Sequence, residues 1–127
     1  MDFTSQICTT HKQSMRLITL GLKKETADMG LAGDIPIAIE NWKIQDTALI
    51  NFPAWSLHRL VEIMPSMLQN LYQLDFGKQG VYYADFSNGS YNFIECFTNR
   101  DVTLYDNIID CIEWLIKQGY FNKEYLN

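Results

Sequence analysis

This chain of 127 residues is poor in the residues that build catalytic and metal sites, with only two histidines and three cysteines. An odd number of cysteines argues against a disulfide framework and favours small buried side chains in a reducing compartment. No stretch approaches the roughly 18 apolar residues that a membrane span needs. The first residues lack the basic and apolar segments of an export signal. We therefore expect a cytoplasmic protein without a cofactor or a metal.

Positive charge is also scarce, since 10 basic residues stand against 15 acidic ones and give a net charge of −5. A protein that binds the phosphate backbone normally carries a basic face, so we expect neither a nucleic-acid nor a membrane partner. What the chain does have is apolar residues, at 47% of the total. This composition predicts one globular domain over residues 1–127.

The clearest local pattern is an amphipathic helix from Thr103 to Gly119. Thr103 and Asp106 form a capping box, and Gly119 provides the left-handed stop. Its apolar residues recur at steps of three and four and predict one buried face: Leu104, Ile108, Cys111, Ile112 and Leu115. A helix of this kind covers an apolar surface.

Two shorter helices are expected nearer the N-terminus. Thr10 and Gln13 form a capping box that opens the first, with Met15, Ile18 and Leu22 pointing inward. Ser56 is an N-cap for the second, which Pro65 ends.

The central block predicts three β-strands, Leu68–Phe76, Gly80–Ser87 and Ser90–Phe97. Asn88-Gly89 is a strong signal for a two-residue hairpin turn, which would place Ser87 opposite Ser90. The predicted pairs then follow: Phe86 with Tyr91, Ala84 with Phe93, Tyr82 with Glu95, Val81 with Cys96, and, across the preceding turn, Phe76 with Val81.

Residues 31–52 are expected to add one or two strands to this meander. Isoleucines alternate over 35–39, with Pro36 placing that strand at an edge or off the sheet, and residues 47–52 are a second candidate. The predicted fold class is α+β: an antiparallel β-meander of three or more strands packed against two main helices, with a short N-terminal helix.

Opposed residues share a face of a sheet, so this register gives the meander one strongly aromatic face. Its candidate interaction residues are Tyr82, Phe86, Tyr91, Phe93 and Phe97. Lys78 is the one basic residue between Leu68 and Phe97, so a platform for stacked nucleic-acid bases is rejected. The open readings are an ordinary intramolecular core, a cover formed by residues 31–52, a second copy of the chain, or a partner protein.

The same register aligns Asp75, Tyr82 and Glu95 in a polar row. Two acids beside a tyrosine are the alternative functional site, suited to a small ligand-binding protein or a hydrolase, although acids that keep a half-exposed face hydrated have the same pattern. The Cys8–His11 spacing is half of a zinc site without its other half. Ser56 and His58 lie two apart on a helix and cannot face each other. No catalytic residue is therefore assigned.

Three segments resemble a group of small uncharacterised proteins of gut Bacteroides-type bacteria, encoded commonly in prophages and other mobile elements. In the first segment the resembling residues are Cys8-Thr9-Thr10, Gln13-Ser14, Leu20-Gly21-Leu22 and Thr26-Ala27-Asp28-Met29. In the second they are Pro53-Ala54-Trp55-Ser56-Leu57, Arg59-Leu60 and Ile63-Met64-Pro65, and in the third Ile112-Glu113-Trp114-Leu115-Ile116 and Gly119-Tyr120-Phe121. The resemblance implies a bacterial or phage accessory protein and carries no known activity. The lack of a catalytic constellation, the acidic composition and the aromatic sheet face together predict a non-enzymatic protein–protein interaction module that uses that face, with a homodimer as one form of that interaction.

Overall fold

The structure is a computed structural model that describes residues 1, 5–39 and 52–127. Contacts divide the chain into two compact units. The first unit comprises Met1–Ile63 and Lys123–Asn127, and the second comprises Met64–Asn122. Two antiparallel sheets and three α-helices in the described residues confirm the α+β class.

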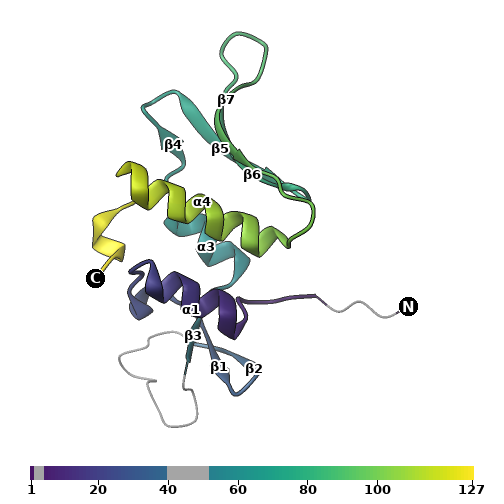
Figure 1. Cartoon of the computed structure of the whole chain (residues 1–127), viewed down its shortest axis with the longest axis vertical. Coiled ribbons are helices and arrows are strands. Elements are labelled where there is room, and N and C mark those ends of the chain that lie inside the picture. The colour runs from purple at the N-terminus through teal and green to yellow at the C-terminus, as the bar shows by residue number, and fades with distance from the viewer. Residues whose placement is uncertain (2–4, 40–51) are drawn as a thin grey trace. The chain divides into compact units, whose positions relative to one another are not determined.

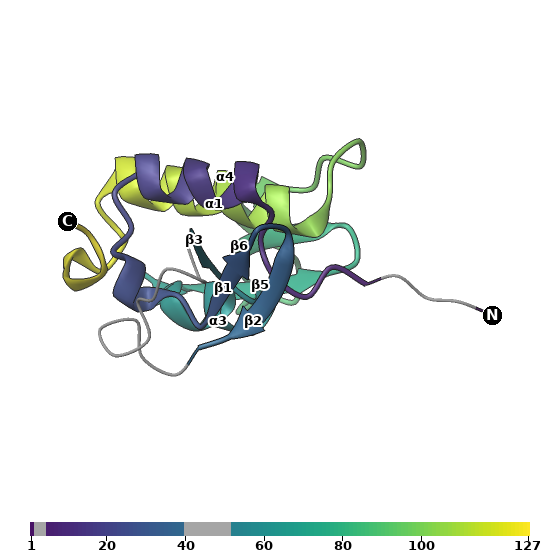
Figure 2. The ribbon, with the colours of Figure 1, turned by 90° about the horizontal axis from the view of Figure 1, so that it is seen from below.

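The first unit contains a three-stranded antiparallel sheet in the order β2-β1-β3. Its elements are α1 (His11–Thr19), a 3₁₀ turn (Lys24–Thr26), β1 (Met29–Ala32), β2 (Ile35–Ala38), β3 (Phe52–Ala54), α3 (Leu57–Ile63) and a second 3₁₀ turn (Lys123–Tyr125). Figure 2 shows β1 and β2 side by side, with Pro36 on the edge strand as predicted. Helix α1 contacts β3.

These strands do not widen the meander, so that prediction is wrong. They enclose a small core of their own, in which Cys8, Leu31 and Ala54 are buried and Met29 and Phe52 pack beside them. Of the second predicted strand, residues 47–51 lie outside the described residues, and its last residue, Phe52, begins β3.

Helix α1 begins as its capping box predicts, with Thr10 accepting the Gln13 backbone N–H and Gln13 reaching back to the Thr10 backbone. The buried face of α1 is shifted by one residue toward the N-terminus, to Ser14 and Leu17 instead of Met15 and Ile18. Leu17 is fully buried, whereas Met15 is 51% exposed, so the inward direction predicted for Met15 is wrong. Ser14 takes the buried position because its hydroxyl shares a hydrogen bond with that of Thr9 at 2.7 Å.

The second unit contains the predicted antiparallel meander, in the strand order β4-β5-β6-β7. Its elements are β4 (Met67–Leu68), β5 (Tyr72–Gly77), β6 (Gly80–Asp85), β7 (Asn92–Phe97) and α4 (Leu104–Gln118). Helix α4 packs on β6 and β7 and runs along the sheet in Figure 1. It has the expected Thr103–Asp106 capping box, and Gly119 follows it with φ of +79°.

Two turns set the first half of this sheet. Gln69 and Asn70 both have positive φ and separate β4 from β5 within the predicted first strand. Gly77 pairs with Gly80 around Lys78 and Gln79, which confirms Phe76 opposite Val81. None of the helices in the described part of the chain is long and apolar enough to cross a membrane.

Candidate interaction surface

Four aromatic rings on β6, β7 and their connecting loop form one continuous cluster. The Phe86 and Tyr91 rings meet edge-to-face with centroids 4.6 Å apart, and Tyr91 stacks near Phe93 at 6.0 Å. Phe93 in turn meets Tyr82 edge-to-face at 5.2 Å. These separations are those of attractive aromatic pairs. We call Tyr82, Phe86, Tyr91 and Phe93 the aromatic patch.

The patch is accessible to solvent at its centre. Tyr91 is 61% exposed and Phe93 is 52% exposed, while Tyr82 and Phe86 are half-buried. Ala84 lies opposite Phe93 on the same face and is fully buried, so its small side chain forms the floor beneath the rings. These exposures exclude the reading of Tyr91 and Phe93 as ordinary core residues. A cluster of exposed rings of this kind is typical of a contact surface.

Phe97 does not belong to the patch, and its predicted place there is wrong. The ladder between β6 and β7 shifts by one residue at Ile94, which leaves Phe93 opposite Ala84 as predicted but puts Phe97 opposite Val81. Phe97 therefore faces α4, where its ring lies 6.1 Å from that of Trp114. The cause is a β-bulge, in which one strand carries an extra residue and every later side chain changes face.

The same bulge separates the predicted polar row. Glu95 lies opposite Tyr83 on the face that α4 covers. The position opposite Tyr82, predicted for Glu95, is occupied by Cys96. The Glu95 carboxylate is close enough to the buried Cys111 thiol of α4 to help raise its pKa, after the larger effect of burial. Asp75 and Tyr82 remain paired across β5 and β6. The row predicted from Asp75, Tyr82 and Glu95 is thus reduced to its first two members.

The remaining pair is a hydrogen bond in which the Tyr82 hydroxyl donates to Asp75 Oδ2 at 3.0 Å. Desolvation, and then this bond, raise the pKa of Tyr82, so its hydroxyl keeps its proton at neutral pH. Both side chains line a recess of about 440 Å³ around the β5–β6 turn, together with Lys78 and without Glu95. This arrangement holds Asp75 in place and provides no second acid.

The turn between β6 and β7 is longer than predicted. Pairing stops at Asp85 and Asn92, so the two-residue turn with Ser87 opposite Ser90 is wrong. Gly89 donates its N–H to the Phe86 carbonyl at 3.2 Å and has φ of +74°. Because the loop from Phe86 to Tyr91 leaves the ladder, its two aromatic ends meet through their rings instead of through backbone pairing.

Charge is nearly absent from the patch face. Asp85 points to the opposite face from Ala84, and its carboxylate accepts the Ser87 backbone N–H at 2.9 Å, a bond that lowers the pKa of Asp85. Glu95 lies on the helix-covered face, which leaves Asp75 as the carboxylate beside the rings. A surface of this composition resembles the centre of a protein interface, where aromatic residues are enriched and charges are depleted.

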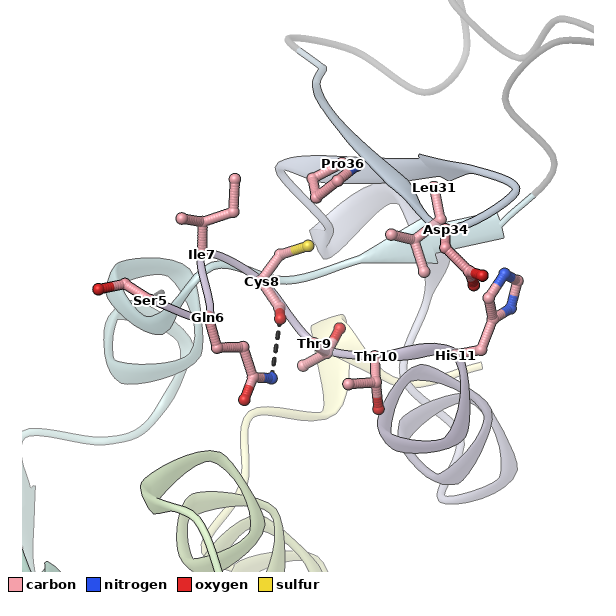
Figure 3. Close-up of a pocket in the computed structure, with 10 residues that line it drawn as sticks. All are labelled: Ser5, Gln6, Ile7, Cys8, Thr9, Thr10, His11, Leu31, Asp34 and Pro36. Atoms are coloured by element: carbon pink, nitrogen blue, oxygen red, sulfur yellow. Dashed lines mark hydrogen bonds between the residues drawn. The ribbon is translucent and has the colours of Figure 1, made fainter. Parts of the chain in front are cut away.

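The cysteine and histidine of the N-terminal segment do not form a reactive pair. They line a cavity of about 370 Å³ in the first unit, where the Cys8 sulfur points toward Pro36 and Leu31 and the His11 ring lies beside Asp34 (Figure 3). His11 Nε2 is 2.8 Å from the Gly33 carbonyl oxygen. Burial, and then the Asp28 charge, raise the pKa of the Cys8 thiol, so it is a poor nucleophile.

Ser56 and His58 are separated as their spacing predicts. The Ser56 hydroxyl donates to Asp28 Oδ2 at 2.5 Å and accepts the Arg59 backbone N–H at 3.1 Å, which makes it the N-cap of α3. His58 lies 3.6 Å from Glu62 on the exposed side of that helix. Among the described residues, no three His, Cys, Asp or Glu side chains gather closely enough to hold a metal ion.

Comparisons of the chain with protein-family models, with curated proteins and with solved structures found no match.

Proposed function

We propose that this protein is a non-enzymatic interaction module that binds another polypeptide through the aromatic patch. The observation that carries the proposal is the exposure of Tyr91 and Phe93, at 61% and 52%, within a continuous set of ring contacts. Aromatic side chains are over-represented among the residues that dominate binding energy at protein interfaces. Rings already packed against one another also lose little conformational freedom when a partner covers them.

The electrostatics of the patch support a protein partner. Asp75 is the carboxylate beside the rings, and it is already bonded to the Tyr82 hydroxyl. A partner that covers the patch therefore meets one carboxylate, and the hydrogen bond from Tyr82 offsets part of the cost of removing it from water. The alternative of a ligand-binding protein or hydrolase has less support, because Glu95 is not beside Asp75 and Tyr82.

The resemblance to small proteins of bacterial prophages and mobile elements supplies the biological context of the proposal. In that context the chain acts in the bacterial cytoplasm as an accessory protein, and its partner is a host or phage protein or the chain itself.

The test is a quantitative binding experiment with a matched control. Tagged wild-type chain, the variant Tyr91→Ser/Phe93→Ser and the variant Met15→Ser/Ile35→Ser capture proteins from a bacterial lysate. The control positions are similarly exposed apolar residues of the first unit, at 51% and 67%. The protein enriched by the wild type is then purified, and its dissociation constant is measured for all three chains.

We expect the patch variant to bind at least about tenfold more weakly than the wild type, because interface aromatics commonly contribute more than 1 kcal/mol each. The control variant should bind like the wild type. Equal dissociation constants for all three chains would remove the patch from the interface and contradict the proposal.

A further inference from the structure

The four-stranded sheet ends in an open edge at β7. In the strand order β4-β5-β6-β7, β7 pairs with β6 on one side and with no strand of the described residues on the other. An open edge carries a row of backbone N–H and C=O groups that another extended strand can pair with.

The two edges of this sheet are unequal. β4 is two residues long, and the turn at Gln69 and Asn70 follows it immediately, so it offers little to a new strand. β7 is six residues long and contains no lysine, arginine or proline, the residues that commonly protect an edge. Two features protect it: the bulge at Ile94, and Glu95, whose carboxylate accepts the Cys96 backbone N–H at 3.2 Å. The long, weakly protected edge lies beside the aromatic patch, because Phe93 belongs to both.

We propose that β7 pairs antiparallel with β7 of a second copy of this chain, so that two sheets join into one and the two aromatic patches lie side by side. This inference rests on the proposed interaction function and names its partner. An edge strand is self-complementary about a two-fold axis, because each copy presents the same row of donors and acceptors to the other. A second copy also supplies a strand of matching length and aromatic content.

Charge on β7 is compatible with this pairing and restricts its register. Glu95 is the one ionisable acid of the strand and lies on the face that α4 covers, so the patch faces of two copies meet without opposed charges. Registers that place Glu95 opposite Glu95 of the second copy are disfavoured by like-charge repulsion. A register centred near Phe93 avoids this and forms a cross-strand aromatic pair.

The test combines molar mass with amide hydrogen exchange on the wild-type chain, so no variant needs to fold. Light scattering after size exclusion measures the mass from about 1 to 500 μM, a range that spans common dimer affinities. Amide exchange is recorded by NMR at the two ends of the range. We expect the mass to rise from 14.8 kDa toward twice that value. Alternate amides of β7 should become protected at high concentration, while those of β4 should not change.

Doubling of the mass without new protection in β7 would overturn this pairing and place the dimer contact elsewhere. A constant monomer mass would also overturn it. In both cases the Tyr91→Ser/Phe93→Ser binding comparison still decides the proposed function, because that experiment measures a partner protein and does not depend on self-association.

Discussion

At the scale of single residues, the three cysteines show how position sets chemistry. Cys8 and Cys111 are buried, and burial raises the pKa of each thiol. Cys96 is exposed on β7 and lies opposite Tyr82. Since the thiolate is the reactive form, burial lowers the reactivity of Cys8 and Cys111, whereas the Cys96 side chain is accessible to reagents.

We therefore expect iodoacetamide to alkylate one thiol of the native protein rapidly near pH 7.5, and to modify Cys8 and Cys111 at least roughly tenfold more slowly. Intact-mass spectrometry over time measures the rates. The Cys96→Ser variant should lack the rapid step. Rapid modification of Cys8 in that variant would show that the cavity beside His11 is open to reagents and that the thiol is reactive.

Thr9 is a second residue whose role depends on a buried hydrogen-bond network. Its hydroxyl accepts the Trp55 backbone N–H at 3.0 Å and shares a bond with Ser14 at 2.7 Å. Thr9→Val keeps the shape but leaves a buried N–H and a buried hydroxyl without this partner. We expect it to lower the free energy of unfolding by about 1–3 kcal/mol, measured by urea denaturation.

The matched control is Thr9→Ser, which retains the hydroxyl and should be less destabilised than Thr9→Val. Equal losses for the two substitutions would assign the effect to the missing methyl group and its packing, and would contradict a role for the hydrogen bonds.

At the scale of elements, Gly80 fixes the approach of β6 to the end of β7. Its φ is +146°, and a Cβ at this position would collide with the Phe97 backbone carbonyl. Its hairpin partner Gly77 has open space where its Cβ would be. The two glycines of one turn thus provide a substitution and its control.

We expect Gly80→Ala to destabilise the protein by at least about 2 kcal/mol, from backbone strain plus the displacement of Phe97, in thermal or urea unfolding. Gly77→Ala should change stability by about 0.5 kcal/mol or less. Similar small effects at both positions would mean that β6 and the end of β7 separate more easily than their pairing indicates.

Elements whose signals are local could be predicted from the sequence. Helices α1, α3 and α4 follow the expected N-caps Thr10, Ser56 and Thr103, because an N-cap satisfies backbone groups within three residues of itself. The Asn88-Gly89 pair correctly predicted a turn between β6 and β7, but the loop is longer than the predicted two residues. The Asp85 carboxylate accepts the Ser87 backbone N–H, and the strand pairing ends at Asp85 and Asn92, before the expected pair of Ser87 with Ser90.

Non-local features could not be predicted. The bulge at Ile94 inserts an extra residue between Phe93 and Glu95 without a local signal, and it moved Phe97 and Glu95 out of the site and Cys96 into it. The same holds for β2, because the isoleucine alternation over 35–39 predicts a strand but not which sheet receives it, and its partner β1 at Met29–Ala32 was not predicted. Four of the five predicted interaction residues remain together because they precede the bulge along β7 or lie on β6 and its loop.

At the scale of the whole molecule, buried and exposed apolar residues have different roles. The core of the second unit contains Ile108 of α4 and Tyr83 of β6, both fully buried. In the aromatic patch of the same unit, by contrast, the Tyr91 and Phe93 side chains are exposed to solvent. With a net charge of −5, the chain carries enough charge to stay dispersed while it keeps that patch nearly neutral. We propose that the patch serves contact with another polypeptide and is not required for folding.

The most direct measurement of that claim is the free energy of unfolding of Tyr91→Ser/Phe93→Ser beside the wild type and the core variant Ile108→Ala. We expect a loss of about 1–2 kcal/mol for the patch variant, from three ring contacts at exposed positions, against about 2–5 kcal/mol for Ile108→Ala. A loss in the patch variant as large as that of the core variant would show that the rings hold the fold together and that the patch is part of the core.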